Sequence, residues 1–326
     1  MNEFAGPRIS VIDPISSAMA RTKLILFQPF NLDRWFLIGF CAWLADLTRP
    51  GGPSFSYRNS SHSTEQIGAQ ITQHLPIIIF VGAVLLTIGL AVTVVLLWLS
   101  SRGRFMFFHC VAENRDEVKA PWRKYRQLGN SLFLFRLALM FIVLFCSGLL
   151  IAAAIILGIT LRHAAGPLPI SLIAVAGIPL LVIIAVAFAV IEKFAKDFIV
   201  PLMALRNCTC TVAWQEFLDL LGANKGRFAL YLLFQIALTL AVAALLFLVA
   251  LATCCCAGCI IMIPYLGTVL LLPVHVFTRS YSLLYLAQYG PAYDAIAATA
   301  PEPQPQPEQE PEQEPRSYTP PPIQGL

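Results

Sequence analysis

The sequence FALYLLFQIALTLAVAALLFLVALATCCCAGCIIMIPYLGTVLLLPVHVFT, residues 228–278, contains no Asp, Glu, Lys or Arg in 51 consecutive positions. An α-helix of about 20 apolar residues crosses the roughly 30 Å hydrocarbon layer of a membrane. The segment is therefore long enough for two spans, with a tight turn near residues 254–258. This one stretch predicts a helical membrane protein.

Three more uncharged runs are each long enough for one span, and they cover residues 75–101, 137–161 and 164–191. A sixth, less hydrophobic candidate covers residues 35–47 and contains Asp46. Of the whole chain, 58% is hydrophobic and 12% is charged, against about 25% charged residues in soluble domains. The composition excludes an ordinary soluble protein and predicts an all-α membrane protein with six transmembrane helices.

The Lys and Arg residues predict the orientation. With six spans, 19 of the 22 basic residues fall on one side of the membrane, and only Arg49, Arg58 and Arg162 fall on the other. Short loops rich in Lys and Arg stay in the cytoplasm. We therefore expect both termini to be cytoplasmic.

The hydropathy pattern predicts three repeated units. Each unit has an amphipathic segment, an Asn closely followed by an aromatic residue, and a helical hairpin. The three asparagines, Asn31, Asn130 and Asn224, lie 99 and 94 residues apart. An amphipathic segment with aromatic and basic side chains is typical of a helix that lies in the lipid headgroup region.

The candidate lipid-interface residues lie in the second and third units: Trp122, Arg123, Lys124, Tyr125, Arg126, Trp214 and Phe217. The indole ring is apolar but carries one hydrogen-bond donor, and it therefore suits this depth. In the alternative interpretation, the same segments are cytoplasmic caps packed on the helical bundle, without lipid contact.

The C-terminal residues 296–326 differ in composition from the transmembrane domain predicted for residues 1–295. From residue 301 the segment is built largely from Pro, Glu and Gln, and such a sequence cannot bury apolar area. We expect a disordered cytoplasmic tail. It acts either as a solvated spacer or as a docking segment for a protein partner.

The sequence contains no catalytic motif, and we expect no catalytic, cofactor-binding or metal-binding residues. Four thiols in Cys254–Cys259 can in principle bind zinc, but the side chains of adjacent residues on one helical turn point in diverging directions. We therefore favour the interpretation that these are small residues that let two helices pack closely. Whether these thiols are free, bridged or metal-bound is left open. Asp46 and His275 are the only titratable groups predicted inside the membrane, and we expect both to reach water.

A second candidate site lies in the predicted sixth span, where Pro264 and Pro273 flank a Gly-containing turn. Proline removes a backbone hydrogen bond and kinks a helix. A kinked span either lines a pathway or fits its neighbours. The candidate pathway residues are Pro264, Thr268 and His275.

Several strings resemble a known family, among them DFIVPLMALR (residues 197–206), PYLGTVLLLP (264–273), YSLLYLAQYGP (281–291) and residues 122–135. They are similar to an uncharacterised bacterial family of multi-pass membrane proteins described as glycerophosphodiester phosphodiesterase membrane-domain-like. The resemblance covers roughly residues 10–295. It implies a bacterial inner-membrane location and a similar helical fold, but no diesterase activity, because the chain has no segment for the catalytic domain.

The sequence thus favours a non-enzymatic membrane module that organises lipid or a protein partner. A transporter or channel for an apolar or lipid-like solute is the alternative. The expected partners are membrane lipids and, through the tail, a protein; no nucleic-acid partner is expected. The substrate and the oligomeric state do not follow from the sequence.

Overall fold

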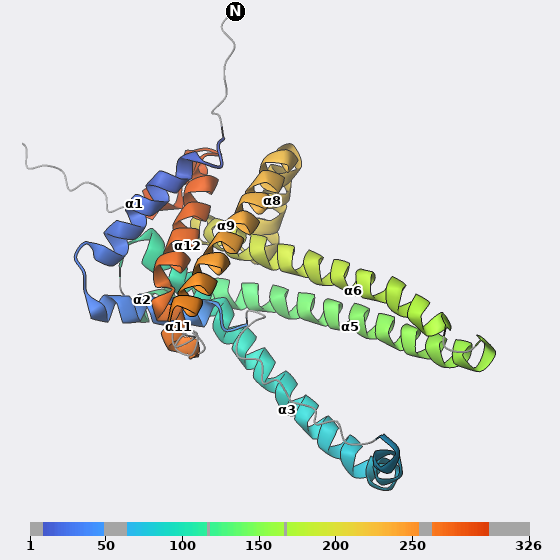
Figure 1. The fold of residues 1–326 in the computed structure, drawn as a ribbon. Helices are drawn as coiled ribbons and strands as arrows, with labels where there is room; N and C mark the ends of the chain where they lie inside the picture. The colour runs from blue at the N-terminus through green and yellow to red at the C-terminus, as the bar shows by residue number, and fades with distance from the viewer. Residues whose placement is uncertain (1–8, 49–63, 116–117, 166–167, 254–262, 300–326) are drawn as a thin grey trace, which may run out of the picture.

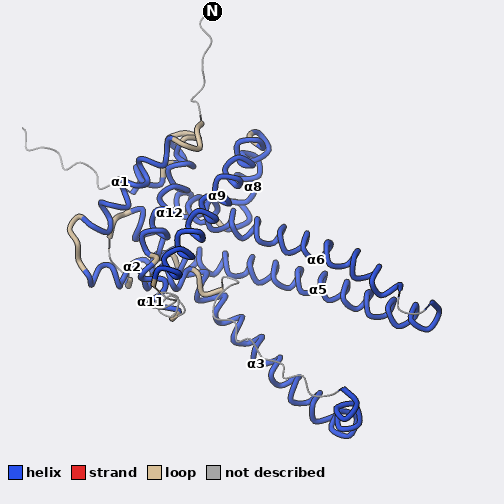
Figure 2. The backbone as a smooth tube through the Cα atoms, viewed as in Figure 1, coloured by secondary structure: helices blue, strands red, loops and turns tan. Residues whose placement is uncertain are grey.

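The computed structural model describes residues 9–48, 64–115, 118–165, 168–253 and 263–299. All regular structure in these residues is helical, and they contain no strand. Figure 1 shows a group of packed helices from which long helices project, and Figure 2 shows the same arrangement as a backbone tube.

Four helices are long and apolar: α3 (Thr64–Ala112), α5 (Arg126–Ala165), α6 (Leu168–Phe194) and α9 (Lys225–Ala252). Each contains or begins a segment long and apolar enough to cross a membrane: Phe80–Ala112, Arg126–Thr160, Gly177–Arg206 and Lys225–Ala252. α5 and α6 run side by side, whereas α3 diverges from them (Figure 1). These segments confirm that the chain has membrane-spanning character.

Shorter helices make up the packed group, here called the helical core: α1 (Asp13–Phe27), α2 (Leu32–Ala45), α4 (Lys119–Lys124), α7 (Val200–Arg206), α8 (Cys210–Ala223), α11 (Pro264–Leu270), α12 (Leu272–Ala287) and α13 (Ala295–Thr299). A π-helical turn (Ala195–Ile199) joins α6 to α7, and a 3₁₀ turn (Pro291–Tyr293) precedes α13. α1 packs along α12, and α2 packs against α3 and α11.

Aromatic rings fill the centre of the helical core. Phe198 stacks on Phe217 at 5.3 Å and contacts Phe228 edge-on at 5.4 Å between ring centroids. Tyr231 and Tyr285 lie 4.7 Å apart beside them. Aromatic pairs in these offset and edge-on arrangements add stability beyond their buried area. They fix the inner ends of α6 and α9 against α8 and α12.

The prediction of six spans is not confirmed, since only four segments qualify among the described residues. α2, which covers most of the predicted span at residues 35–47, has 14 residues, or about 21 Å at 1.5 Å per residue, and it buries much of its surface on neighbouring helices. The last third of residues 228–278 forms two helices, α11 and the start of α12, that meet at Leu271. Pro273 lies in the first turn of α12 rather than inside a continuous span, a position where its missing N–H costs nothing.

Three further predictions are tested only in part or not at all. Residues 296–299 of the predicted tail belong to α13, whereas residues 300–326 lie outside the described residues. Cys254–Cys259 also lie outside them. The three-unit repeat stays a prediction: a short helix precedes a longer one at α4–α5 and α8–α9, whereas α1 and α2 have 15 and 14 residues.

Candidate functional site: a buried polar cluster at the base of the long helices

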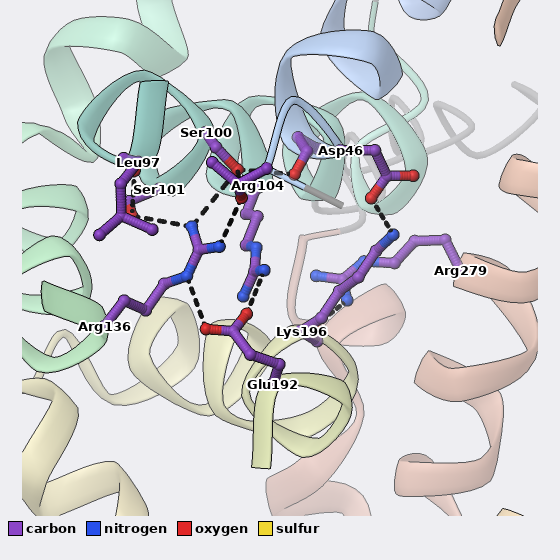
Figure 3. A network of polar contacts seen from close by, with 11 residues as sticks. Asp46, Leu97, Ser100, Ser101, Arg104, Arg136, Glu192, Lys196 and Arg279 are labelled. Atoms are coloured by element: carbon purple, nitrogen blue, oxygen red, sulfur yellow. Dashed lines mark hydrogen bonds and ion pairs between the residues drawn. The ribbon is translucent and has the colours of Figure 1, made fainter. Parts of the chain in front are cut away.

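Charged side chains from five helical segments meet where the long helices enter the helical core (Figure 3). They are organised around three carboxylates, Asp46, Glu192 and Asp197. We call these carboxylates and the side chains bound to them, together with Arg279, the polar cluster. Its members come from the C-terminal cap of α2, from α3, α5, α6 with its π-helical turn, α9 and α12.

Glu192 on α6 binds two arginines from different helices. Its Oε2 accepts a hydrogen bond from Nη2 of Arg104 on α3 at 2.5 Å, and its Oε1 accepts one from Nε of Arg136 on α5 at 3.0 Å. Both arginines are more than nine-tenths buried. Charge-assisted hydrogen bonds of this kind are among the strongest in proteins, so Glu192 holds the bases of α3, α5 and α6 together.

Arg136 extends this contact to α2. Its Nη1 donates to Ser101 Oγ at 3.1 Å and to Ser100 Oγ at 3.3 Å, and its Nη2 donates to Thr48 Oγ1 at 2.7 Å. The planar guanidinium group presents its donors in a fixed fork. One side chain therefore sets the relative positions of four segments.

Asp46, just after α2, forms the second centre. Its Oδ1 lies 2.5 Å from Nζ of Lys196 in the π-helical turn, and its Oδ2 lies 3.4 Å from Nδ1 of His275 on α12. Asp46 and His275 are both partly buried and face each other, because α2 and α12 pack against the same side of the core. The expectation that both reach water stays a prediction.

Asp197 forms the third centre, a closed ring of four side chains. Its Oδ2 accepts from Nζ of Lys193 at 2.8 Å and from the hydroxyl of Tyr231 at 2.9 Å. Gln235 then closes the ring: its Nε2 donates to the Tyr231 hydroxyl at 3.2 Å and its Oε1 accepts from Lys193 at 3.3 Å. Every member has a partner, as a buried polar network requires for stability.

Arg279 on α12 lies between the second and third centres. Its Nη1 donates to the backbone oxygen of Lys196, in the π-helical turn, where the irregular backbone changes the hydrogen-bond pattern of the helix. Its guanidinium carbon lies 5.5 Å from the centre of the Phe108 ring. Burial lowers the pKa of Arg279 to about 10, so the group stays charged at neutral pH.

Cations outnumber carboxylates in the polar cluster. Arg104, Arg136, Lys193, Lys196 and Arg279 carry five positive charges, against three negative charges on Asp46, Glu192 and Asp197. With His275 neutral, the surplus is two positive charges. Among the described residues, no group of three or more His, Cys, Asp or Glu side chains is placed to hold a metal ion. The arrangement suits an anion.

The predicted interfacial residues of the second unit divide into an exposed and a packed set. Arg123, Lys124 and Arg126 are exposed, and Lys124 pairs with Glu113 at 3.0 Å. Trp122 is half-buried, and the guanidinium of Arg102 lies over its ring at 5.0 Å and over that of Trp98 at 4.3 Å. Tyr125 is buried, stacked on Phe105. Only the basic residues and part of Trp122 are thus open to headgroups.

In the third unit, the two predicted residues lie on the protein side of α8. Trp214 is half-buried between Phe135 and Phe217, and Phe217 is fully buried. Their positions match the alternative interpretation, in which this segment caps the bundle.

Two cavities in the described structure lie beside these units. One of about 340 Å³ along α4 includes Trp122 and Arg123, and one of about 460 Å³ between α6, α8 and α9 includes Lys225 and Phe228.

The structure describes the side chains of two of the three predicted pathway residues. Thr268 lies half-buried on α11, His275 faces Asp46, and the side chain of Pro264 lies outside the described residues. Neither of the two cavities above includes Thr268 or His275.

Three cysteines of the described residues are buried. The Sγ atoms of Cys41 and Cys110 lie 3.8 Å apart, and burial raises the pKa of Cys210 to about 12, which suits a structural thiol.

Sequence reasoning missed most of the polar cluster, because Arg104, Arg136, Glu192, Lys196 and Arg279 were counted as charges of cytoplasmic loops. One signal was available. Lys193, Lys196 and Asp197 follow i, i+3, i+4 spacing directly after an apolar span, so they share a helix face that continues the span. Charged side chains on a helix face that continues an apolar span need counter-charges or hydrogen-bond partners.

Comparisons with known proteins identify the family of the chain and give no information on its function. Residues 9–272 match a family of unknown function, DUF7544. No curated protein and no solved structure matches the chain. The family match covers most of the chain, as the expected resemblance does, but it provides no link to a glycerophosphodiester phosphodiesterase or to bacteria.

Proposed function

The chain belongs to this family of unknown function, and we propose from its geometry that it is a non-enzymatic membrane module that organises lipid around splayed helices held at their bases by the helical core. One observation carries the proposal. In the most apolar window of each of the four spans, at most 11% of the residues are buried inside the protein, while their inner ends are locked in the polar cluster.

The exposed surface of the spans is apolar on all sides. On α3, residues 81–90 are all exposed, including Leu86 at 74%, and on α5 Phe145 is 72% exposed. Contiguous apolar surface of this extent marks contact with a membrane or another protein. Because α3 diverges from α5 and α6 (Figure 1), lipid chains fill the space between them in our proposal.

The helical core lies on the cytoplasmic side in this proposal. The inner ends of all four spans meet the core, and most Lys and Arg residues of the chain lie in or beside it. Short basic segments stay in the cytoplasm. Arg123, Lys124 and Arg126, exposed near the base of α5, then face anionic headgroups, where each basic residue adds about 1 kcal/mol of attraction. The tail beyond α13 extends into the cytoplasm, where it is available to a protein partner.

The transporter alternative has less support. It draws on the break between α11 and α12 at Leu271 and on the His275–Asp46 pair beside it. A pathway requires a continuous opening past Thr268 and His275, and neither residue lines the two cavities described above. Organisation of lipid is therefore the function that the geometry supports best.

A nitroxide scan of α3 tests the proposal. A spin label is placed at one position at a time across residues 81–90 in lipid nanodiscs, and its collision rate with oxygen is measured. If lipid surrounds the helix, every position is accessible to oxygen. A partner protein or a second copy would protect a stripe of positions recurring every three to four residues, and such a stripe would refute the proposal. Labels at exposed Phe145 and Leu240 extend the test to α5 and α9.

A further inference from the structure

Two arginines of the polar cluster leave buried N–H groups without a partner. Arg104 is 8% exposed and Arg279 is 3% exposed. Arg104 uses only Nη2, toward Glu192, and Arg279 uses only Nη1, toward the backbone of Lys196. Nε and Nη1 of Arg104 and Nε and Nη2 of Arg279 are buried and have no hydrogen-bond acceptor among the residues that the structure describes. A buried donor left unsatisfied costs about 1–3 kcal/mol, and more when it is charged.

The two guanidinium groups belong to one place in the fold. Arg104 and Phe108 are four residues apart on α3 and therefore share a helix face, and the guanidinium of Arg279 lies 5.5 Å from the Phe108 ring. In Figure 3 the side chain of Arg279 reaches from α12 toward the guanidinium of Arg104. The charge of Arg104 also contributes to the lowered pKa of Arg279.

The excess of positive charge in the polar cluster also favours a bound anion. Its five cations face three carboxylates, and Arg104 and Arg136 already share the single carboxylate of Glu192. The ion pairs that the described structure gives Asp46, Glu192 and Asp197 are with other cations, and Asp197 and Asp46 act on Arg279 through their charge, which raises its pKa. Burying a charge without a counter-charge is costly. An anion with up to two negative charges and several oxygen acceptors would satisfy both the free donors and the surplus.

We propose that Arg104 and Arg279 form a binding site for a phosphate group. Phosphate oxygens accept paired hydrogen bonds from guanidinium groups in the geometry that two arginine forks provide. The site lies at the bases of the apolar helices, where headgroups of an anionic lipid end, and the same chemistry also fits free phosphate. This inference goes beyond the proposed function, since lipid can surround the spans whether or not this site is occupied.

The test uses the full chain in a maltoside detergent, which contains no phosphate group. The probes are inorganic phosphate, with chloride of equal ionic strength as the reference, and phosphatidylglycerol, with an uncharged glycolipid as the reference. Thermal unfolding and native mass spectrometry report binding. We expect at least one phosphate probe to raise the unfolding temperature. A shift with inorganic phosphate identifies free phosphate as a sufficient ligand, and a shift with phosphatidylglycerol alone identifies the lipid headgroup.

Variants separate this site from general charge attraction. Arg279→Gln removes the fork without touching the ion pairs of Glu192, and we expect it to weaken phosphate binding about tenfold or more, as loss of a charge-assisted pair does. Arg279→Lys keeps the charge but loses the fork and should bind with intermediate affinity. Arg227→Gln, at an exposed position in the first turn of α9 to which no binding role is assigned, is the matched control and should bind as the unchanged chain does.

Three results would overturn the proposal. Neither probe binds, binding is unchanged in Arg279→Gln, or Arg227→Gln loses binding to the same extent. The unfolding temperature of each variant without ligand shows that it is folded before binding is compared. If Arg279→Gln does not fold, Arg279→Lys decides, and unchanged binding in that variant contradicts the role of the fork.

Discussion

Arg136 shows how one residue connects the membrane-facing helices. It lies on α5, and its donors reach α6, α3 and the end of α2. In water such contacts contribute little, since exposed ion pairs are worth about 0–1 kcal/mol. The Arg136 side chain, however, is only 3% exposed, so its ion pair is a buried one. Each charge has lost its water, and only the complete set of partners offsets that loss.

We therefore expect removal of the Glu192 carboxylate to lower the stability of the folded protein strongly. Glu192→Gln leaves Arg104 and Arg136 buried without their counter-charge, and we expect roughly 3–5 kcal/mol of lost stability, as for one partner of a buried pair. Denaturation in mixed micelles with increasing dodecyl sulfate measures this loss.

The matched control is Glu216→Gln, which breaks the more exposed pair with Arg206 at 3.0 Å. We expect a change of about 0–1 kcal/mol for this surface pair. Equal losses in the two variants would contradict the role assigned to Glu192.

At the residue scale, the sequence allowed only part of the site to be predicted. The exposed basic residues Arg123, Lys124 and Arg126 were expected, since a cluster of basic residues in a short segment has few other roles. The polar cluster was not, because its charges come from residues 46–279 and each looks like an ordinary loop charge by itself. Only tertiary packing brings them together.

At the element scale, α2 and α3 cross closely at Gly103. A Cβ atom on Gly103 would lie 2.6 Å from the carbonyl carbon of Leu44 and 2.8 Å from the backbone nitrogen of Ala45. Backbone atoms cannot move aside as a flexible side chain can. This glycine lets α2 pack directly on α3, next to Asp46 and Ser100.

Gly103→Ala should separate the two helices. We expect a loss of about 1–3 kcal/mol, as for overpacking of a well-packed core, together with weaker contact between Thr48 and Arg136. Thermal unfolding measures the first effect.

Gly89→Ala on the same helix is the control, because a Cβ atom there meets nothing within 4 Å. Alanine favours a helix over glycine by roughly 0.5–1 kcal/mol, so this variant should be as stable as the unchanged chain or more so. If Gly103→Ala behaves like Gly89→Ala, the described α2–α3 contact is incorrect.

Helices with long apolar runs were the predictable elements. The uncharged runs at residues 75–101 and 137–161 lie in α3 and α5, and residues 168–191 of the third run lie in α6. An apolar run of that length has no stable state in water other than burial in lipid or protein. The short elements were not predictable. α2 is too short to span, and α11 and α12 divide at Leu271, since docking on neighbours, through contacts such as Trp35 Nε1 to the Val269 oxygen at 2.9 Å, outweighs hydropathy there.

At the scale of the whole molecule, two kinds of surface are separated in space. The helical core buries the polar cluster and the aromatic rings at its centre, whereas the helices that project from it (Figure 1) expose apolar side chains. A protein with this division depends on its surroundings for its shape. The apolar surfaces of α3, α5, α6 and α9 must contact lipid, a partner or one another, and the polar cluster limits how far they can close.

Native mass spectrometry of the full chain, extracted in polymer nanodiscs with its surrounding lipid, tests this account most directly. The account predicts that lipid molecules stay bound to the folded chain under activation that removes bulk lipid, and that deletion of residues 300–326 leaves this lipid in place. Release of all lipid from a chain that stays folded, with another protein or a second copy covering the spans instead, would contradict it.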